Sequence, residues 1–231
     1  MTTRAPRVTN RTEDAQASAA QPPPAPPHVD FDDGPSGRIL AAAREILLRD
    51  GYSGLTMDGL TLALGMSKKT LYVHFSSKDA MVSAILAATG ATVLRRVGEI
   101  LQRQGGFVEK LDGVLRIVAA HIGCYNAEIL ADLQRFAPQL YDEIDAIKVH
   151  NIPLGLTRVL KLGVEQGMVR DDVDTTFLVE YWLVVARGLH DPAMLARTQL
   201  TSQDAFNKAL DLFFSGALTS SGRARVRARR E

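Results

Sequence analysis

Apolar residues recur at helical spacing along most of the chain. The first such run consists of Ile39, Ala43, Ile46 and Leu47. These positions lie at i, i+4, i+7 and i+8, so they share one face of a helix, which Gly51 should end. We find no stretch with the two-residue alternation of a half-buried strand, and the pattern therefore predicts an all-α protein.

Hydroxyl residues mark the starts of the next three helices. Thr56, Ser67 and Ser77 each precede a helical pattern, where a side-chain oxygen can accept a hydrogen bond from a free backbone N–H. Gly65 should end the first of these helices within about two turns, because glycine readily adopts the left-handed conformation. The pattern predicts short helices over 56–65 and 67–75 and a long fourth helix from 77 to about 103.

The rest of the chain divides into further helices and two polar ends. Pro153 should break or kink the helix that contains it, since proline lacks the backbone N–H. The ends show no apolar periodicity, so we predict a Pro- and Ala-rich disordered arm over 1–36 and a basic disordered tail over 219–231. The further helices are predicted over 107–124, 127–135, 138–167, 174–190 and 202–217.

Composition argues against several classes of protein. The single cysteine, Cys124, allows neither an intrachain disulfide nor a cysteine metal cage. The histidines are scattered, and the chain lacks the P-loop, Rossmann, G-x-S-x-G and H-E-x-x-H motifs of common enzymes. We find no apolar run of the ~18 residues that a membrane span needs and no apolar signal segment at the N-terminus. We therefore expect a cytoplasmic protein that is not an enzyme, binds no metal and needs no cofactor.

Positive charge is unevenly distributed. Residues 37–90 hold six Lys and Arg against four Asp and Glu, whereas residues 91–221 hold thirteen against sixteen. The last ten residues hold five Arg and one Glu. A contact with nucleic acid would therefore fall in the short basic segment or in the tail rather than in the mildly acidic middle of the chain.

The two short helices over 56–75 have the layout of a helix-turn-helix, joined by a tight glycine turn. On the second of them, Leu71 and Phe75 share one face and can complete a small core. The opposite face presents Lys69, Tyr72 and Val73, flanked by Lys68 and Thr70. Such a face offers cations to phosphate or guanine and an apolar group to a thymine methyl. From composition alone, a small bundle with a solvated lysine pair stays equally open.

A longer series of correctly spaced residues identifies this segment. The matching features are Gly51-Tyr52, Thr56-Met57, Gly65-Met66-Ser67-Lys68, Thr70-Leu71-Tyr72, His74-Phe75 and Ser77-Lys78. On these features, residues 38–86 resemble the N-terminal domain of the TetR family of bacterial regulators. The resemblance implies base contacts by Lys68, Lys69, Thr70 and Val73, and backbone contacts by Thr56, Tyr72, His74 and Lys78. Together with Ser67, which begins the helix, these are the candidate residues for binding double-stranded DNA.

The resemblance also implies the domain organisation. A three-helix DNA-binding domain over 37–90 would be joined by the long fourth helix to a helical-bundle domain over 91–218 for effector binding and dimerisation. Helices 174–190 and 202–217 are the expected homodimer contact, because their apolar residues exceed what one bundle should cover. The residues concerned are Phe177, Tyr181, Val184, Val185, Phe206, Leu210, Phe213 and Phe214. The alternative is that both helices are buried within the monomer.

The expected effector pocket lies between helices 107–124, 138–167 and 174–190. Its candidate residues combine apolar surface with polar tips and are His121, Tyr125, Phe136, Tyr141 and Trp182. The predicted function is a repressor that binds an inverted-repeat operator and releases it when a small molecule binds. The alternative is an effector-independent DNA-organising protein of the same fold, whose second domain would lack an internal cavity.

Overall fold

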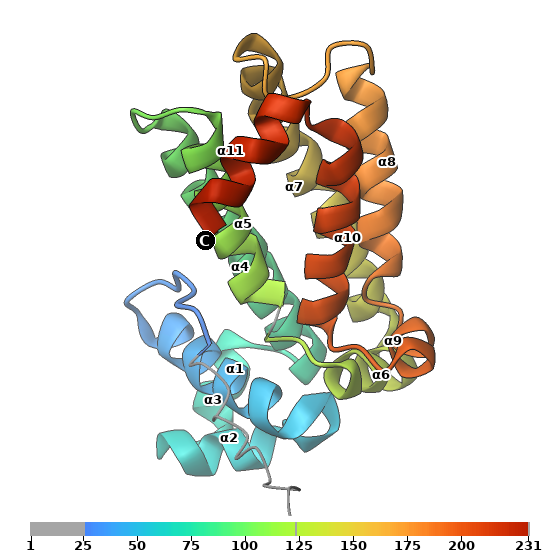
Figure 1. The fold of residues 1–231 in the computed structure, drawn as a ribbon. Helices are drawn as coiled ribbons and strands as arrows, with labels where there is room; N and C mark the ends of the chain where they lie inside the picture. The colour runs from blue at the N-terminus through green and yellow to red at the C-terminus, as the bar shows by residue number, and fades with distance from the viewer. Residues whose placement is uncertain (1–25, 123, 231) are drawn as a thin grey trace, which may run out of the picture.

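Helices make up nearly all of the regular structure in the computed structural model, which describes residues 26–122 and 124–230 (Figure 1). In these residues one isolated antiparallel bridge, between Val169 and Leu218, is the only strand-like pairing. The prediction of an all-α fold is confirmed. The helices are α1 (Pro35–Gly54), α2 (Met57–Leu64), α3 (Lys68–His74), α4 (Lys78–Gln102), α5 (Phe107–Ile122), α6 (Ala127–Phe136), α7 (Pro138–Glu165), α8 (Thr175–Gly188), α9 (Pro192–Thr198), α10 (Ser202–Ala217) and α11 (Ser220–Arg230).

The helices α1 to α3 form a small N-terminal lobe, which lies below the larger lobe in Figure 1. Gly51 interrupts α1 with a φ of 76°, the left-handed region that glycine tolerates best. The start of α4 completes the core of this lobe. Burial of apolar side chains is the main stabilising contribution to such a small core. Five side chains of this core are completely buried: Ile39, Leu47, Leu60, Leu71 and Met81.

The long helix α4 leads from the small lobe into the large one and packs on α1, α5 and α7. Among the described helices, α4 by itself is long and apolar enough to cross a membrane, and the bent pair α5–α6 would pass the same test if taken as one span. The apolar face of α4 is covered by protein: Met81, Val82 and Ile85 are fully buried. The hydropathy of α4 is thus that of a core helix.

The large lobe is a bundle in which α7 packs between α4 and α8, while α10 contacts α5 and α8. We predicted a break or kink at Pro153, and no break occurs there, because α7 runs through this proline as one helix from Pro138 to Glu165. Packing of α7 on both neighbours offsets the lost hydrogen bond. The short helix α9 was not predicted, although Asp191 caps it by accepting a hydrogen bond from the Ala193 N–H at 2.9 Å.

Residues 26–36 are ordered, although they belong to the predicted disordered arm over 1–36. Val29 is 4% exposed, and the Asp30 N–H donates to Thr92 Oγ1 of α4 at 3.0 Å. The Asp30 carboxylate also pairs with Arg95, which lowers the pKa of that carboxyl. The sequence pattern did not reveal this contact, because it depends on one buried valine and one backbone hydrogen bond to a distant helix. Residues 1–25 of the predicted arm lie outside the described residues.

The basic tail is the helix α11, and the prediction of a disordered tail over 219–231 is wrong for residues 220–230. Its backbone carries on from the Val169–Leu218 bridge, and the Thr219 N–H donates to the Met168 oxygen at 2.9 Å. Arg229 lies 3.6 Å from an Asp112 oxygen and 3.9 Å from a Glu109 oxygen of α5. Arg229, which looked solvated in the sequence, therefore faces two acidic residues of α5 that only the fold brings opposite it.

Candidate DNA interface and effector cavity

The helix-turn-helix is held by short-range hydrogen bonds that its sequence encodes. Thr56 Oγ1 accepts from the Gly59 N–H at 3.0 Å, and Ser67 Oγ accepts from the Thr70 N–H at 3.1 Å. Between the two helices Gly65 adopts φ 63° and ψ 30°, the left-handed turn that sets α3 across α2. These caps satisfy N–H groups that a helix start leaves unpaired, so both short helices begin where the sequence predicts.

The helix α3 exposes the face predicted to meet DNA. Leu71 is completely buried, which anchors the helix on its inner side. Val73 is 76% exposed and Tyr72 is 50% exposed on the outer side. Of the other candidate residues, Thr56, Ser67, Lys68, Lys69 and Thr70 are also exposed. The outer face therefore presents cations, hydroxyls and one branched apolar group to solvent, as groove recognition requires.

Lys68 is held by an acidic residue that the sequence analysis did not single out. Its Nζ lies 2.7 Å from Asp58 Oδ1, and this hydrogen bond raises the pKa of Lys68. Both side chains are exposed, at 61% and 71%, so the pair is a surface contact that phosphate can replace. Lys69 has no such partner among the described residues. The two neighbouring lysines thus differ in the free protein: Lys68 is paired with a carboxylate and Lys69 is not.

Two candidate residues face the protein rather than the outer side of α3. His74 Nδ1 lies 3.0 Å from Ser36 Oγ at the start of α1. Lys78 Nζ donates to the Tyr52 carbonyl oxygen at 3.1 Å and lies 3.7 Å from the centre of the Tyr52 ring. Both side chains therefore brace α1 against the helices that follow, and a contact of either with the DNA backbone remains a prediction.

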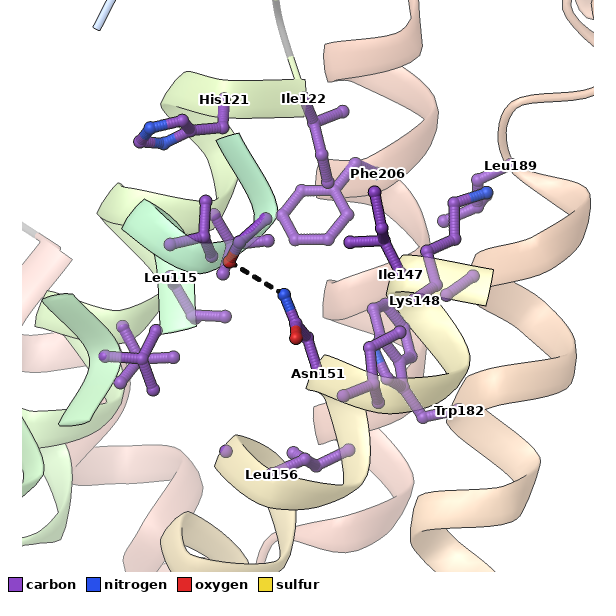
Figure 2. Close-up of a pocket in the computed structure, with 18 of the residues that line it drawn as sticks. Leu115, His121, Ile122, Ile147, Lys148, Asn151, Leu156, Trp182, Leu189 and Phe206 are labelled. Carbon is purple, nitrogen blue, oxygen red and sulfur yellow. Dashed lines mark hydrogen bonds between the residues drawn. The ribbon is translucent and has the colours of Figure 1, made fainter. Parts of the chain in front are cut away.

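The large lobe contains an apolar cavity of about 220 Å³ between α4, α5, α7, α8 and α10 (Figure 2). Its wall is built chiefly from Leu, Val and Ile side chains, together with Trp182, Phe206, Phe213 and Phe214. Ligand sites in proteins have this composition, mostly apolar with a few polar groups that orient the ligand. The cavity places α4, which begins beside α3, in direct contact with any bound molecule.

Three of the five predicted pocket residues line this cavity: His121, Tyr125 and Trp182. Tyr141 lies just outside it and donates through its hydroxyl to the His190 carbonyl oxygen at 3.1 Å. Phe136 is misplaced by the prediction. It is 54% exposed at the end of α6, where the Arg135 guanidinium lies 5.0 Å from its ring centre. Phe136 is the last residue of α6, and Pro138 begins the next helix, so its side chain points outward at the junction. The spacing of apolar residues in the sequence did not reveal this.

Several polar groups of the cavity wall were not predicted. Asn151 Nδ2 donates to the Gly90 carbonyl oxygen at 2.9 Å, which ties α7 to α4 across the cavity (Figure 2). Lys148 and His190 also line the wall. Burial lowers the pKa of Lys148 to about 8 and that of His190 to about 4. The sequence shows all three as ordinary polar residues, because only the packing of α7 against α4 and α8 turns them inward.

Two groups of hydrogen bonds connect the lobes. Asp132 of α6 accepts from the Ser53 N–H at 2.6 Å and from the Ser53 hydroxyl at 2.7 Å. Asp79 of α4 accepts from Tyr52 Oη at 2.5 Å and from Gln139 Nε2 at 2.8 Å. Burial, followed by the Asp79 hydrogen bond, raises the pKa of Tyr52 to about 12. These bonds tie α6 to α1 and α7 to the start of α4, and α1 packs on α2 of the helix-turn-helix.

An exposed apolar stripe runs along α8. Phe177, Tyr181 and Val184 are 61%, 50% and 71% exposed, and they lie at i, i+4 and i+7. Leu212 of α10 is 77% exposed. We call these four residues the α8 stripe. A patch of large apolar side chains left in water on adjacent helices is typical of an interface.

The aromatic residues predicted on α10 are not part of this surface. Phe213 is 6% exposed and Phe214 is 5% exposed, and the two rings meet edge to face with centres 5.1 Å apart. Phe206 and Leu210 are buried as well. These four side chains fill the monomer core and wall the cavity. The alternative of burial within the monomer therefore holds for these four residues of α10, whereas Phe177, Tyr181 and Val184 of α8 are exposed.

Comparison with known proteins places the chain among regulators of transcription. Residues 39–85 match the model of the bacterial regulatory proteins, tetR family. The uncharacterized HTH-type transcriptional regulator YvaF of Bacillus subtilis is 26% identical over 182 residues, which cover 78% of this chain and 93% of YvaF. The DNA-binding transcriptional repressor TetR of Mycobacteroides abscessus is 27% identical over 186 residues, which cover 79% of this chain and 88% of that repressor.

A solved structure agrees with the fold. The ketosteroid transcriptional regulator KstR2 of Mycobacterium tuberculosis superposes with a TM-score of 0.52 at 20% sequence identity. The alignment covers 83% of this chain and 99% of that chain, so it includes both lobes. The predicted layout of a helix-turn-helix joined to a second helical domain is confirmed.

Proposed function

Because this chain belongs to the TetR family of bacterial regulatory proteins and is a DNA-binding regulator of transcription, we propose that it is a repressor released from its operator by a small molecule. The observation that carries the proposal is the apolar cavity of the large lobe, whose wall includes α4. The description of the Mycobacteroides abscessus relative as a repressor favours repression. A regulator of this kind acts on the chromosome, so we assign it to the cytoplasm and assign it no catalytic role.

DNA recognition is assigned to the outer face of α3. In a helix-turn-helix, the second helix enters the major groove and its first residues meet the base edges. We assign base reading to Lys69 and Val73, which α3 exposes, and phosphate contacts to the exposed Thr56 and Ser67 at the helix starts. Lys68 reaches the DNA after it exchanges Asp58 for a phosphate oxygen.

Two copies of the chain would act together through the α8 stripe. A two-fold contact between α8 and α10 of each protomer makes a four-helix interface, which covers the apolar side chains that the monomer leaves in water. Two α3 helices related by that axis read an inverted repeat, with half-sites about 34–36 Å apart or a multiple of that distance.

Release follows from linkage between the two lobes. A ligand that prefers a different position of α4 and α7 binds the DNA-competent dimer less well, and it weakens DNA binding by the same factor. The hydrogen bonds of Asp132 to Ser53 and of Gln139 to Asp79 transmit such a shift to α1. The cavity also counts against an effector-independent DNA-organising protein, which has no use for an internal ligand site.

The test begins with the operator. Selection of bound duplexes from a random DNA pool should enrich an inverted repeat, and placing that repeat in a promoter should let the protein silence a reporter gene. A pool without enriched sequence would refute the regulator proposal. The variant Leu156→Phe fills part of the cavity (Figure 2) and should repress normally while losing its response to inducing molecules. An unchanged response in this variant would move the effector site elsewhere.

A further inference from the structure

The charge inside the cavity is of one sign. Among the described residues that line it, Lys148 is the one Lys or Arg, and neither Asp nor Glu is present. Lys148 lies at the side of the cavity formed by α7 and the end of α8, beside Leu189 in Figure 2. The remaining wall is apolar apart from Thr89, Asn151, Tyr125 and two histidines.

The positive charge of Lys148 is only partly balanced by protein. Its nearest carboxylate oxygen, Asp145 Oδ1, is 3.9 Å away, beyond hydrogen-bond range. The other oxygen of Asp145 is held by Arg187 Nε at 2.7 Å. The three groups together carry one net positive charge. The Lys148 side chain is 15% exposed, and a cation so far from water is unfavourable unless another group pairs with it.

A second unpaired group lies next to Lys148. His190 is 7% exposed, and its Nδ1 has no hydrogen-bond partner among the described residues. Burial and the neighbouring Lys148 lower the pKa of His190, so the imidazole is neutral at pH 7. A neutral imidazole offers one donor or acceptor at this nitrogen, according to its tautomer. The α7–α8 side of the cavity thus has a cation without a close carboxylate and a neutral imidazole whose Nδ1 makes no hydrogen bond of normal geometry within the described part of the chain, with the Ala186 backbone as its nearest influence.

Building on the proposed effector cavity, we propose that the effector is an amphipathic anion, an apolar body with a single carboxylate, and that the carboxylate pairs with Lys148 Nζ. The apolar body lies along the leucine- and valine-lined wall toward Trp182 and Phe206 (Figure 2). The carboxylate balances the net charge of Lys148, Asp145 and Arg187 and accepts from the ammonium group.

Other ligand classes fit the wall less well. A cationic ligand would meet Lys148 and find no carboxylate among the lining residues. A neutral ligand of the same shape would fill the apolar part but would leave the ammonium without a close partner and with less water around it. Among ligands of the same shape, the charge of the ligand should therefore decide which binds most tightly.

The experiment uses three ligands of one chain length: decanoate, decanol and decylamine. Trp182 is the only tryptophan of the chain and lines the cavity, so its emission reports occupancy without DNA. Decanoate should bind the full-length protein on the order of ten- to a hundredfold more tightly than decanol, and decylamine should bind least. The variant Lys148→Met should abolish the preference for decanoate by weakening its binding to the level of decanol, and Lys148→Arg should restore it.

The controls separate this inference from the proposed function. Lys161→Met removes an exposed lysine of the same helix and should leave all three affinities unchanged. Equal binding of decanoate and decanol to the wild-type protein would overturn the inference, while occupancy of the cavity would still stand. Failure of all three to bind would overturn the inference together with the effector cavity. Binding to the selected duplex is measured separately, so a failure of the DNA-binding proposal would be seen even where decanoate binds.

Discussion

The exposed α8 stripe and the buried α10 aromatics make opposite predictions for the same kind of substitution. Val184 is 71% exposed, so Val184→Glu should change the stability of a monomer by no more than about 0.5 kcal/mol. Phe213 is 6% exposed against Trp182, and a glutamate there leaves both a cavity and a buried charge. Phe213→Glu should therefore destabilise the fold by more than about 4 kcal/mol, a large part of the stability of a typical domain.

In the dimer, Val184→Glu acts twice, because a two-fold contact places one copy from each protomer at the interface. Each loses the burial of a valine side chain, and each carboxylate loses part of its hydration. With about 2 kcal/mol or more for each copy, dissociation should be favoured by at least ~4 kcal/mol, or roughly a thousandfold in Kd. Folded monomers and weak binding to an inverted-repeat duplex should result.

Light scattering coupled to gel filtration measures the mass, and circular dichroism measures the helix content. A matched control is Val73→Glu, since Val73 is 76% exposed on α3 and far from α8 in the chain. This variant should stay dimeric and lose DNA binding. A Val184→Glu protein that keeps the dimer mass would refute the assignment of the interface to the α8 stripe.

Four further predictions follow from other contacts. Lys69→Ala should weaken binding to the selected duplex by about 1–3 kcal/mol and relax specificity at one base position, and an unchanged affinity after alanine replaces both Lys68 and Lys69 would remove α3 from the interface. Deleting 220–231 should lower Tm by roughly 2–8 °C in a calorimetric scan, since α11 contributes about 1–2 kcal/mol through a half-buried valine and surface ion pairs. Decanoate binding should weaken as the pH rises through about 8, because Lys148 is protonated below its pKa and neutral above it. A fluorescence titration whose affinity stays constant between pH 6 and pH 10, roughly two units on each side of that pKa, would contradict this. Asp132→Asn should reduce the response of DNA binding to decanoate with little effect on decanoate affinity, and an unchanged response would move the connection between the lobes away from Ser53.

Local chemistry explains why the DNA-binding lobe was predictable. The N-caps at Thr56 and Ser67 and the left-handed turn at Gly65 depend on residues within four positions of one another. Leu71 was placed inside and Val73 outside by the helical period alone. Because nearby residues set the start, the end and the buried face of these helices, the folded protein has them where the sequence predicts. The family resemblance then supplied the role of the exposed face.

The larger lobe was predictable as helices but not as surfaces. Phe213 and Val184 are equally apolar in a sequence pattern, yet one is in the core and the other is in water, because the answer depends on which helices pack on α10 and α8. The Arg-rich tail looked unable to fold, but it forms α11, whose Val226 packs against the core and whose Arg229 lies opposite Asp112 and Glu109 of α5.

The sequence by itself determined the helix-turn-helix, the all-α class and the presence of more apolar residues than one bundle should cover. Only the tertiary structure decided that Lys148 and His190 face a cavity, since its wall is assembled from α4, α5, α7, α8 and α10, which are spread over residues 78–217. The physical reason is the range of the interactions. Capping and turns act over a few residues, whereas burial and the pairing of charges depend on every element packed around a side chain.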